Sequence, residues 1–246
     1  MLLCRRSMAQ RARGPLGVVL VAVLLGGCSI GSDTDAPDDG EGASQTAQAA
    51  SGSAVCDPAP PLPSDVPTFR STQAPSATAP DRQVVTIRTN CGPITVTLNG
   101  ADAPQTVASF LLLSDGDYWA DSPCHRLVDG GIHVLQCGDP TGTGRGGPGY
   151  TFGIENAPTD GSYPRGTLAM ARNQDPDSNG GQFFIVFEDT TLPVQGGGYT
   201  IFGTVTDGMD IVDHIAERGV DGGGTEGPPA QPISIVGVEI EEEASS

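Results

Sequence analysis

The sequence predicts a mostly β domain, a closed and mostly antiparallel barrel with two α-helices. Short runs rich in branched apolar residues recur between residues 83 and 241, and glycine-rich turns separate them. Only two segments in this range show the helical spacing of apolar residues. Many short strands with few helices are typical of barrels, in which closure leaves no strand edge unpaired.

The first elements are a hairpin and a helix. The runs VVTIRT (84–89) and ITVTL (94–98) alternate branched apolar with polar residues, and NCGP between them is a turn signal. APQTVASFLLLSDG (103–116) then changes to helical spacing, with Pro104 in the first turn and Gly116 just past the end.

The later elements continue the β pattern. A second helix is expected in DGMDIVDHIAERG (207–219), where Ile211, Val212 and Ile215 share a face and Gly219 ends the helix. The remaining strands are expected at HRLV, HVLQC, TLAMA, QFFIVF, YTIFGTV and ISIVGVEI. One domain over 83–241, followed by a short tail over 242–246, accommodates all of them.

Two further segments precede this domain. Residues 1–27 combine a basic start with an apolar run too short to span a membrane, which predicts a signal peptide. The run ends in LLGGC, which resembles a bacterial lipobox, so Cys28 would be lipid-modified after cleavage; an ordinary secretory signal is the alternative. Residues 28–82 are rich in Ser, Gly, Ala and Pro and predict a disordered tether.

The charge of the chain limits its partners. The formal net charge is −18, and from Cys28 onward 8 basic residues stand against 30 acidic ones. Such a segment does not bind nucleic acid or an anionic membrane surface. We therefore expect membrane attachment through the N-terminal lipid only, at the extracytoplasmic face of the cell membrane.

The cysteines predict disulfide bonds. Exported chains oxidise their thiols, and the four cysteines outside the signal and the lipobox allow three pairings. The favoured pairing joins Cys124 to Cys137 across neighbouring strands, and Cys56 to Cys91 at the first hairpin. Free buried thiols are the alternative.

The histidines beside these cysteines do not predict a metal site. On a strand His133 and Cys137 would lie ~13 Å apart, and the neighbours Cys124 and His125 would point to opposite faces. Zinc needs four converging ligands. GDPTGTGRGGPGY also lacks the lysine and the following helix of a phosphate-binding loop. No metal and no cofactor are expected.

Several motifs together resemble one family. CHRLVDGGIHVLQCGDPTGTGRGGPGY, with GTLAMARN, NGGQFFIVF and YTIFGTV, closely resembles the cyclophilin-type peptidyl-prolyl isomerases over roughly Gln83 to Glu241. The resemblance implies an eight-stranded antiparallel barrel closed by two helices, with a substrate groove on its outer face. It also implies peptidyl-prolyl cis–trans isomerase activity.

The resemblance assigns roles to single residues. Arg126 falls on the family's catalytic arginine and Gln136 on the glutamine of the groove. His133 and Val134 replace a phenylalanine and a methionine, and His133 would either line the groove or face solvent. The other substrate-binding positions that the resemblance implies are Ala171, Arg172, Asn173, Gln182, Phe184, Leu192 and Tyr199.

The chemistry of the reaction is consistent with an arginine. Rotation about a prolyl peptide bond has a barrier of ~18–20 kcal/mol. A permanently charged guanidinium with five donors in a rigid plane, beside an apolar pocket, would stabilise the twisted amide without a nucleophile or a metal. We expect a monomeric isomerase that acts on proline-containing segments of unfolded or exported proteins. The alternative is a proline-peptide-binding or chaperone module with little turnover. The departures at His133, at Val134 and at Thr191, which stands where the family has a tryptophan, leave this alternative open.

Overall fold

The computed structural model of the protein describes residues 56–76 and 78–242. The expected signal peptide, the expected lipidation of Cys28 and the first part of the expected tether lie outside the described residues. No helix in these two ranges has the length and apolar character needed to cross a membrane.

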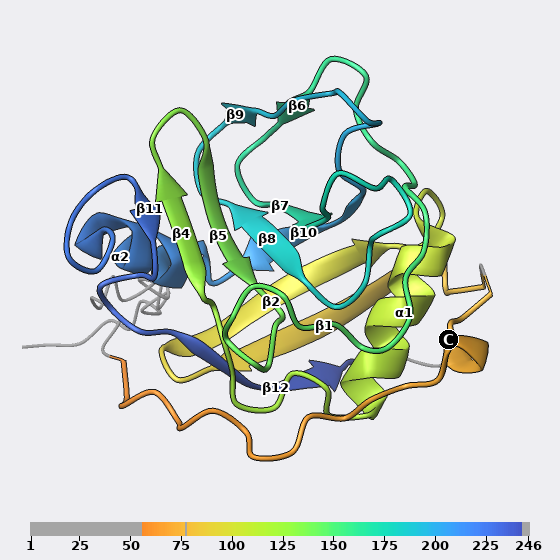
Figure 1. Ribbon diagram of the computed structural model, residues 1–246, viewed down its shortest axis with the longest axis horizontal. Helices are drawn as coiled ribbons and strands as arrows, with labels where there is room; N and C mark the ends of the chain where they lie inside the picture. The colour runs from red at the N-terminus through yellow and green to blue at the C-terminus, as the bar shows by residue number, and fades with distance from the viewer. Residues whose placement is uncertain (1–55, 77, 243–246) are drawn as a thin grey trace, which may run out of the picture. The chain divides into compact units, whose positions relative to one another are not determined.

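The described residues form an antiparallel sheet of ten strands that curls on itself (Figure 1). The strand order is β11-β4-β5-β8-β7-β10-β2-β1-β12-β3. The strands are β1 (Arg82–Thr89), β2 (Gly92–Asn99), β3 (Ser122–Pro123), β4 (Arg126–Asp129), β5 (His133–Cys137), β7 (Thr167–Met170), β8 (Phe183–Val186), β10 (Ile201–Asp207), β11 (Glu226–Gly227) and β12 (Ser234–Ile240). A separate two-stranded sheet joins β6 (Ser162–Tyr163) to β9 (Thr190–Thr191).

The sheet is open, so the expectation of a closed eight-stranded barrel is wrong. β11 and β3 are the two ends of the strand order, and within the described residues no pairing joins them. Each contributes only two residues to its ladder, β11 against β4 and β3 against β12. The chain itself crosses between the two ends of the sheet, because only Cys124 and His125 separate β3 from β4. The result is a curled half-barrel.

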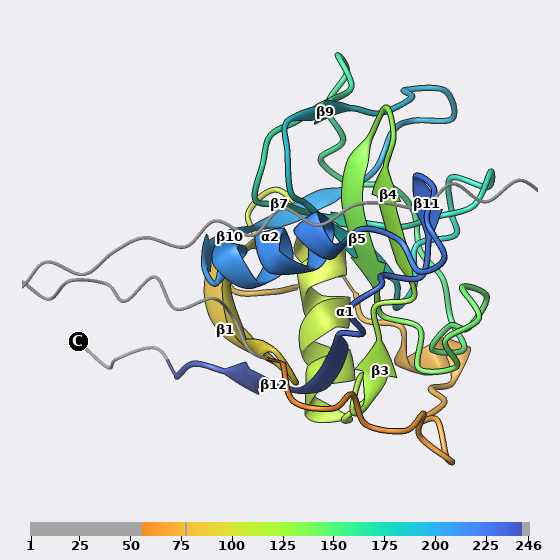
Figure 2. The same ribbon diagram turned by 90° about the vertical axis from the view of Figure 1, so that its left-hand side faces the viewer.

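Both helices lie where the sequence predicts them, α1 at Pro104–Asp115 and α2 at Met209–Arg218. They lie at opposite ends of the curled sheet (Figures 1 and 2). The residue before α1, Ala103, has no side chain that could cap the helix. Glu155, distant in sequence, caps it instead: its carboxylate accepts hydrogen bonds from the backbone N–H groups of Gln105 and Thr106 at 3.0 and 2.8 Å.

Two apolar clusters lie on opposite faces of the sheet. In β8, Phe183 and Ile185 belong to the main core, whereas Phe184 and Val186 belong to a smaller cluster on the other face. This follows from the period-two alternation of side chains along a strand. β8 is therefore buried on both faces, which explains its uninterrupted apolar sequence. The smaller cluster is the floor of the site described below.

The segment from residue 56 to residue 76 is attached to the domain. Cys56 is disulfide-bonded to Cys91, and the N–H of Asp57 donates to the carbonyl of Asn90 at 2.8 Å. The short 3₁₀ helix η1 (Ser71–Gln73) follows Phe69, whose ring packs edge-on against two tyrosine rings of the domain. One disulfide and the two aromatic contacts of Phe69 thus hold this part of the expected tether against the domain.

Candidate active site

A row of side chains crosses four strands on the outer face of the sheet. The pairing of β4 with β5 places Arg126 opposite Gln136, and the pairing of β5 with β8 places Gln136 opposite Phe184. Phe184 in turn lies opposite Ala169 of β7. Residues opposite one another in a ladder point to the same face, so the strand register alone brings a charged, a polar and two apolar side chains into one line.

A cavity of about 310 Å³ opens over this row; because its floor is apolar, it is called the apolar cavity below. Its floor consists of side chains that are almost fully buried, among them Phe184 and Leu192. The residues that line it are Arg126, Ile132, Val134, Gln136, Ala171, Arg172, Phe184, Leu192 and Tyr199. A small apolar ring fits such a cavity, with one guanidinium at its edge.

Arg126 is held from two sides. Its Nε donates to Oε1 of Glu226 at 2.9 Å, and its Nη1 donates to Oε1 of Gln136 at 3.0 Å. Glu226 belongs to β11, which pairs with the strand that carries Arg126. The arginine side chain remains about one-third exposed, at 34%, so its other N–H groups are accessible to a molecule in the groove.

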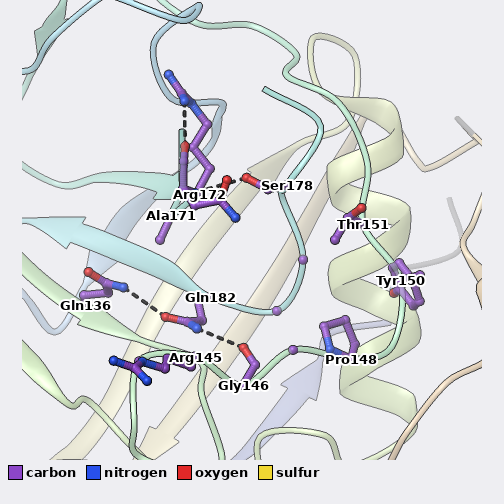
Figure 3. A pocket seen from close by; sticks show the side chains of 15 residues that line it. Gln136, Arg145, Gly146, Pro148, Tyr150, Thr151, Ala171, Arg172, Ser178 and Gln182 are labelled. Carbon is purple, nitrogen blue, oxygen red and sulfur yellow. Dashed lines mark hydrogen bonds between the residues drawn. The ribbon is translucent and has the colours of Figure 1, made fainter. Parts of the chain in front are cut away.

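A chain of hydrogen bonds continues from Arg126 across the groove. Nε2 of Gln136 donates to Oε1 of Gln182 at 3.0 Å, and Nε2 of Gln182 donates to the carbonyl of Gly146 at 2.9 Å (Figure 3). In both glutamines the side-chain amide oxygen accepts a hydrogen bond from one neighbour, and the amide nitrogen donates one to the next. The orientation of Gln136, and with it that of Arg126, is therefore fixed from the loop at Gly146.

A second cavity, of about 420 Å³, adjoins the first and shares Gln136, Ala171 and Arg172 with it. Much of its wall is backbone, because five of its positions are glycine. The other residues that line it are Gly144, Arg145, Gly146, Gly147, Pro148, Tyr150, Thr151, Asn173, Ser178, Gly180, Gly181 and Gln182 (Figure 3). The two cavities together form one groove.

Arg172 lies at the junction of the two cavities. Its guanidinium stacks on the ring of Tyr199, 5.0 Å from the centroid. Its N–H groups donate to the carbonyls of Gly198, Asn173 and Gln195 at 2.6, 2.8 and 3.2 Å. One arginine thus connects the glycine-rich loop of residues 194–198 to the rim of the groove.

Of the residues expected in the substrate site, His133 lies on the wrong face. Nδ1 of His133 contacts Oδ1 of Asp129 at 2.9 Å, and its ring packs edge-on against Phe187, so it does not line either cavity. Alternation along β5 sends His133 to the face opposite Val134. The same alternation brings Ile132 into the apolar cavity, a residue that the sequence comparison missed. Asn173 and Gln182 line the second cavity only.

The two disulfides follow the pairing favoured from the sequence. Cys124 is bonded to Cys137, and Cys56 to Cys91. The first of these joins the residues next to β4 and at the end of β5, the two strands that carry Arg126 and Gln136. It therefore fixes the base of the site. In the described ranges no three His, Cys, Asp or Glu side chains converge as ligands of a metal ion would.

The loop beneath the groove is organised by a buried carboxylate. Asp139 is fully buried and accepts five hydrogen bonds, among them those from the N–H groups of Thr141 and Gly146. Burial alone would raise its pKa, but these hydrogen bonds outweigh burial and lower the pKa below the usual value. Position 146 must be glycine, because a Cβ there would lie 2.0 Å from Oδ1 of Asp139.

His125, beside Arg126 in the chain, is a partly buried histidine whose two ring nitrogens are shielded from solvent. Neither ring nitrogen has a hydrogen-bond partner among the described residues. Burial lowers its pKa, and the nearby Asp139 opposes this only in part. The ring lies under the loop that lines the second cavity, since a Cβ on Gly144 would contact it at 3.4 Å.

The family to which the chain belongs follows from a comparison with known families. Residues 84–240 match the family described as "Cyclophilin type peptidyl-prolyl cis-trans isomerase/CLD". The chain belongs to the cyclophilin family. The match begins and ends with the curled sheet, at β1 and β12, so the whole groove lies within the cyclophilin domain.

Relatives of this cyclophilin come from bacteria and from a protozoan. The chain is similar to proteins named "Probable peptidyl-prolyl cis-trans isomerase B", at 42% identity in Mycobacterium leprae and 44% in Mycobacterium tuberculosis. These matches cover 67% and 65% of this chain but 59% and 55% of the relatives. The chain therefore spans little more than half the length of these curated relatives.

A solved structure is also similar. It is a Cryptosporidium parvum cyclophilin-type peptidyl-prolyl cis-trans isomerase, crystallised in the presence of the dipeptide Ala-Pro. It is 33% identical to this chain, with a TM-score of 0.55 over 65% of this chain and 100% of that one. The shared fold is thus the cyclophilin domain alone.

Proposed function

We propose that this cyclophilin is a peptidyl-prolyl cis–trans isomerase that accelerates the proline-limited folding of exported proteins. The observation that carries the proposal is the placement of Arg126 at the edge of an apolar cavity, held by Gln136 and Glu226 with part of its guanidinium accessible. The family and the names of its relatives support the same activity. The crystals of the protozoan relative with Ala-Pro support a substrate that contains proline.

The proposed mechanism is non-covalent. The proline ring enters the apolar cavity over Phe184 and against Val134 and Leu192. Two of the five N–H groups of Arg126 are engaged by Glu226 and Gln136, which leaves three for the substrate amide. When the amide twists, the prolyl nitrogen regains its lone pair and accepts a hydrogen bond that the planar nitrogen does not, so an N–H group of Arg126 directed at this nitrogen lowers the rotational barrier of ~18–20 kcal/mol. No proton changes place and no bond forms or breaks.

Replacement of Arg126 by alanine tests this mechanism. Isomerisation of an Ala-Pro test peptide by the variant should fall by about 100-fold or more, the usual loss when a preorganised donor is removed. The measurement is the cis–trans exchange rate, with circular dichroism of both proteins as the check on folding. Equal and negligible rates for the wild type and the variant, with binding of the peptide retained, would leave a proline-peptide-binding module in place of an enzyme.

We further propose that the protein acts as a monomer, attached by a lipid on Cys28 to the extracytoplasmic face of the cell membrane. The LLGGC sequence supports lipidation, and two disulfides in the described residues support an oxidising compartment. Cys28→Ala should release the protein from the membrane fraction; a variant that stays bound would place the anchor elsewhere.

A further inference from the structure

The charged side chains that line the groove are basic, although the protein as a whole is acidic. The chain has 30 acidic and 12 basic residues, yet no aspartate or glutamate among the described residues lines either cavity. Three arginines do: Arg126, Arg145 and Arg172. A cation-lined groove within a negatively charged surface attracts negative groups selectively, because the rest of the surface repels them.

Within the described part of the chain, two of these arginines have no carboxylate partner. Arg126 is paired with Glu226, but the ion pairs among the described residues include neither Arg145 nor Arg172. The guanidinium of Arg172 is hydrogen-bonded only to backbone carbonyls, which carry no net charge. Arg145 is exposed, and only its backbone N–H takes part in hydrogen bonds.

Three carboxylates on the loops that carry Arg145 and Arg172 are engaged outside the two cavities. Asp139 lies beneath the loop that carries Arg145, fully buried and saturated by hydrogen bonds from that loop. Asp175 accepts the N–H of Asp177 within its own turn. The carboxylate of Asp177 lies beside Gly153, since a Cβ added to that glycine would be 3.0 Å from Oδ1 of Asp177. Neither Asp175 nor Asp177 lines a cavity.

The second cavity has room for a substrate side chain. Its glycine-rich wall leaves about 420 Å³ open, and it meets the apolar cavity at Gln136, Ala171 and Arg172. An extended peptide advances ~3.3 Å per residue. A residue close to the proline in sequence therefore reaches this cavity or its junction with the first. In the view of Figure 3, Arg172 lies on one side of the Gln136–Gln182 hydrogen bond and Arg145 on the other.

From this arrangement we infer that the groove selects substrates in which an aspartate or glutamate lies within three residues of the proline, with Arg145 and Arg172 as the selecting residues. The inference rests on the proposed isomerase activity and specifies its substrate class. A carboxylate at the junction completes the missing ion pair of Arg172, which still has two N–H groups available. Exposed ion pairs of this kind correspond to a preference of about fivefold at low salt.

The test compares peptides that differ only in charge. In an Ala-Pro peptide, glutamate or glutamine is placed in turn at each of the two positions before the Ala-Pro unit and at each of the three positions after it, all within three residues of the proline. The ratio of kcat/KM for the glutamate and glutamine peptides should reach about fivefold at one or more positions. This ratio should approach one in 1 M salt, at which charges are screened beyond ~3 Å.

Variants then identify the residues responsible. Arg145→Gln and Arg172→Gln should each reduce the ratio, and the double variant should bring it to about one. Arg172→Lys keeps the charge but loses the planar hydrogen-bonding pattern, so it separates the effect of charge from the effect of loop geometry. Arg218→Gln removes the same charge from the exposed last turn of α2, outside both cavities, and should leave the ratio unchanged.

The possible outcomes separate this inference from the proposed activity. A wild type that isomerises the glutamine peptides but gives a ratio near one at every position overturns the inference alone. A ratio that survives in the double variant also overturns it. If no peptide is isomerised, the proposed activity fails. The Kd ratio of the same peptides, measured by NMR titration, then decides the inference: a fivefold tighter glutamate peptide supports it and equal Kd values overturn it.

Discussion

At the scale of single residues, the most informative contact is the one between Arg126 and Glu226. It arises from a strand of two residues at the end of the sheet, and it orients the guanidinium along the groove. Because both side chains are partly exposed, the contact affects orientation more than overall stability.

Glu226→Gln should lower kcat/KM of the proposed isomerase about twofold to fivefold, because a neutral amide holds the guanidinium less firmly than a carboxylate does. The decrease should be in kcat, with KM little changed, since the apolar cavity is not altered. Steady-state kinetics on a neutral Ala-Pro peptide measures both. Glu217→Gln on the exposed face of α2 is the matched control. An unchanged kcat would show that Gln136 alone suffices to orient Arg126.

His125 predicts a dependence of stability on pH. Its pKa in the folded protein is lowered by burial, so below the unfolded value of about 6.5 the unfolded chain binds more protons. The free energy of unfolding is therefore at its full value above pH 6.5 and decreases as the pH falls from 6.5 toward the folded pKa. Urea titrations between pH 7.5 and pH 5 measure this slope.

Two histidine variants test whether His125 causes this dependence of the free energy of unfolding on pH. His125→Gln should flatten it, whereas His214→Gln on α2, which leaves His125 in place, should retain it. A wild-type free energy of unfolding that is constant over this range would contradict the burial of a neutral imidazole at position 125.

Single residues also show what the sequence could and could not predict. The resemblance to the cyclophilin family placed Arg126, Gln136 and Phe184 in one groove, and the strand register shows how these three side chains come to lie in one line. His133 was assigned to the groove only as one of two alternatives. Strict alternation from Val134 would have excluded it and found Ile132. Glu226 carried no signal, since its role depends on a contact 100 residues away in sequence.

At the scale of secondary structure, the periodic elements were predictable and the short ones were not. Both helices and the long strands repeat a pattern over enough residues to be recognised. β3, β6, β9 and β11 have two residues each, too few for any period, and their pairing partners define them. Two of these strands form the ends of the sheet, which is why closure of the barrel was wrongly expected.

The N-terminus of α1 depends on a residue that no local pattern identifies. Glu155→Gln should lower the free energy of unfolding by about 1 kcal/mol, because the helix loses a negative charge at its N-terminus and keeps a weaker acceptor for the same N–H groups. Denaturant titration at pH 7 measures the change, again with Glu217→Gln as the control. Equal unfolding midpoints for Glu155→Gln and the wild type would mean that solvent caps this helix equally well.

At the scale of the whole molecule, the groove and the core share the same strands. β5, β7 and β8 have core side chains on one face and site side chains on the other. The site is therefore supported by the most buried part of the sheet, and the Cys124–Cys137 bond joins the end of β5 to the residues just before β4. This arrangement preorganises the arginine, which a mechanism based only on hydrogen bonds requires.

The folding unit extends beyond the sheet to residue 56, and this gives the last prediction. A chain that begins at residue 83 contains the whole family match but lacks the disulfide to Cys91 and the contacts of Phe69 with Tyr118 and Tyr150. The disulfide spans 35 residues, and closing a loop of this length stabilises a protein by about 3–4 kcal/mol in the chain-entropy treatment. The shorter chain should therefore be less stable than one that begins at residue 56; the difference is this contribution and that of Phe69, reduced by the entropy cost of ordering residues 56–82.

The double variant Cys56→Ser/Cys91→Ser, in the chain that begins at residue 56, separates the two contributions. It loses the disulfide but keeps Phe69 against Tyr118 and Tyr150, so its stability should lie between those of the two chains. Because the groove itself is complete without residues 56–82, kcat/KM at a temperature where all three proteins are folded should differ less than twofold. Equal unfolding midpoints for the chains beginning at residues 56 and 83 would instead mean that the N-terminal segment lies on the domain without stabilising it, and that the sheet, the two helices and the Cys124–Cys137 bond are sufficient for the fold.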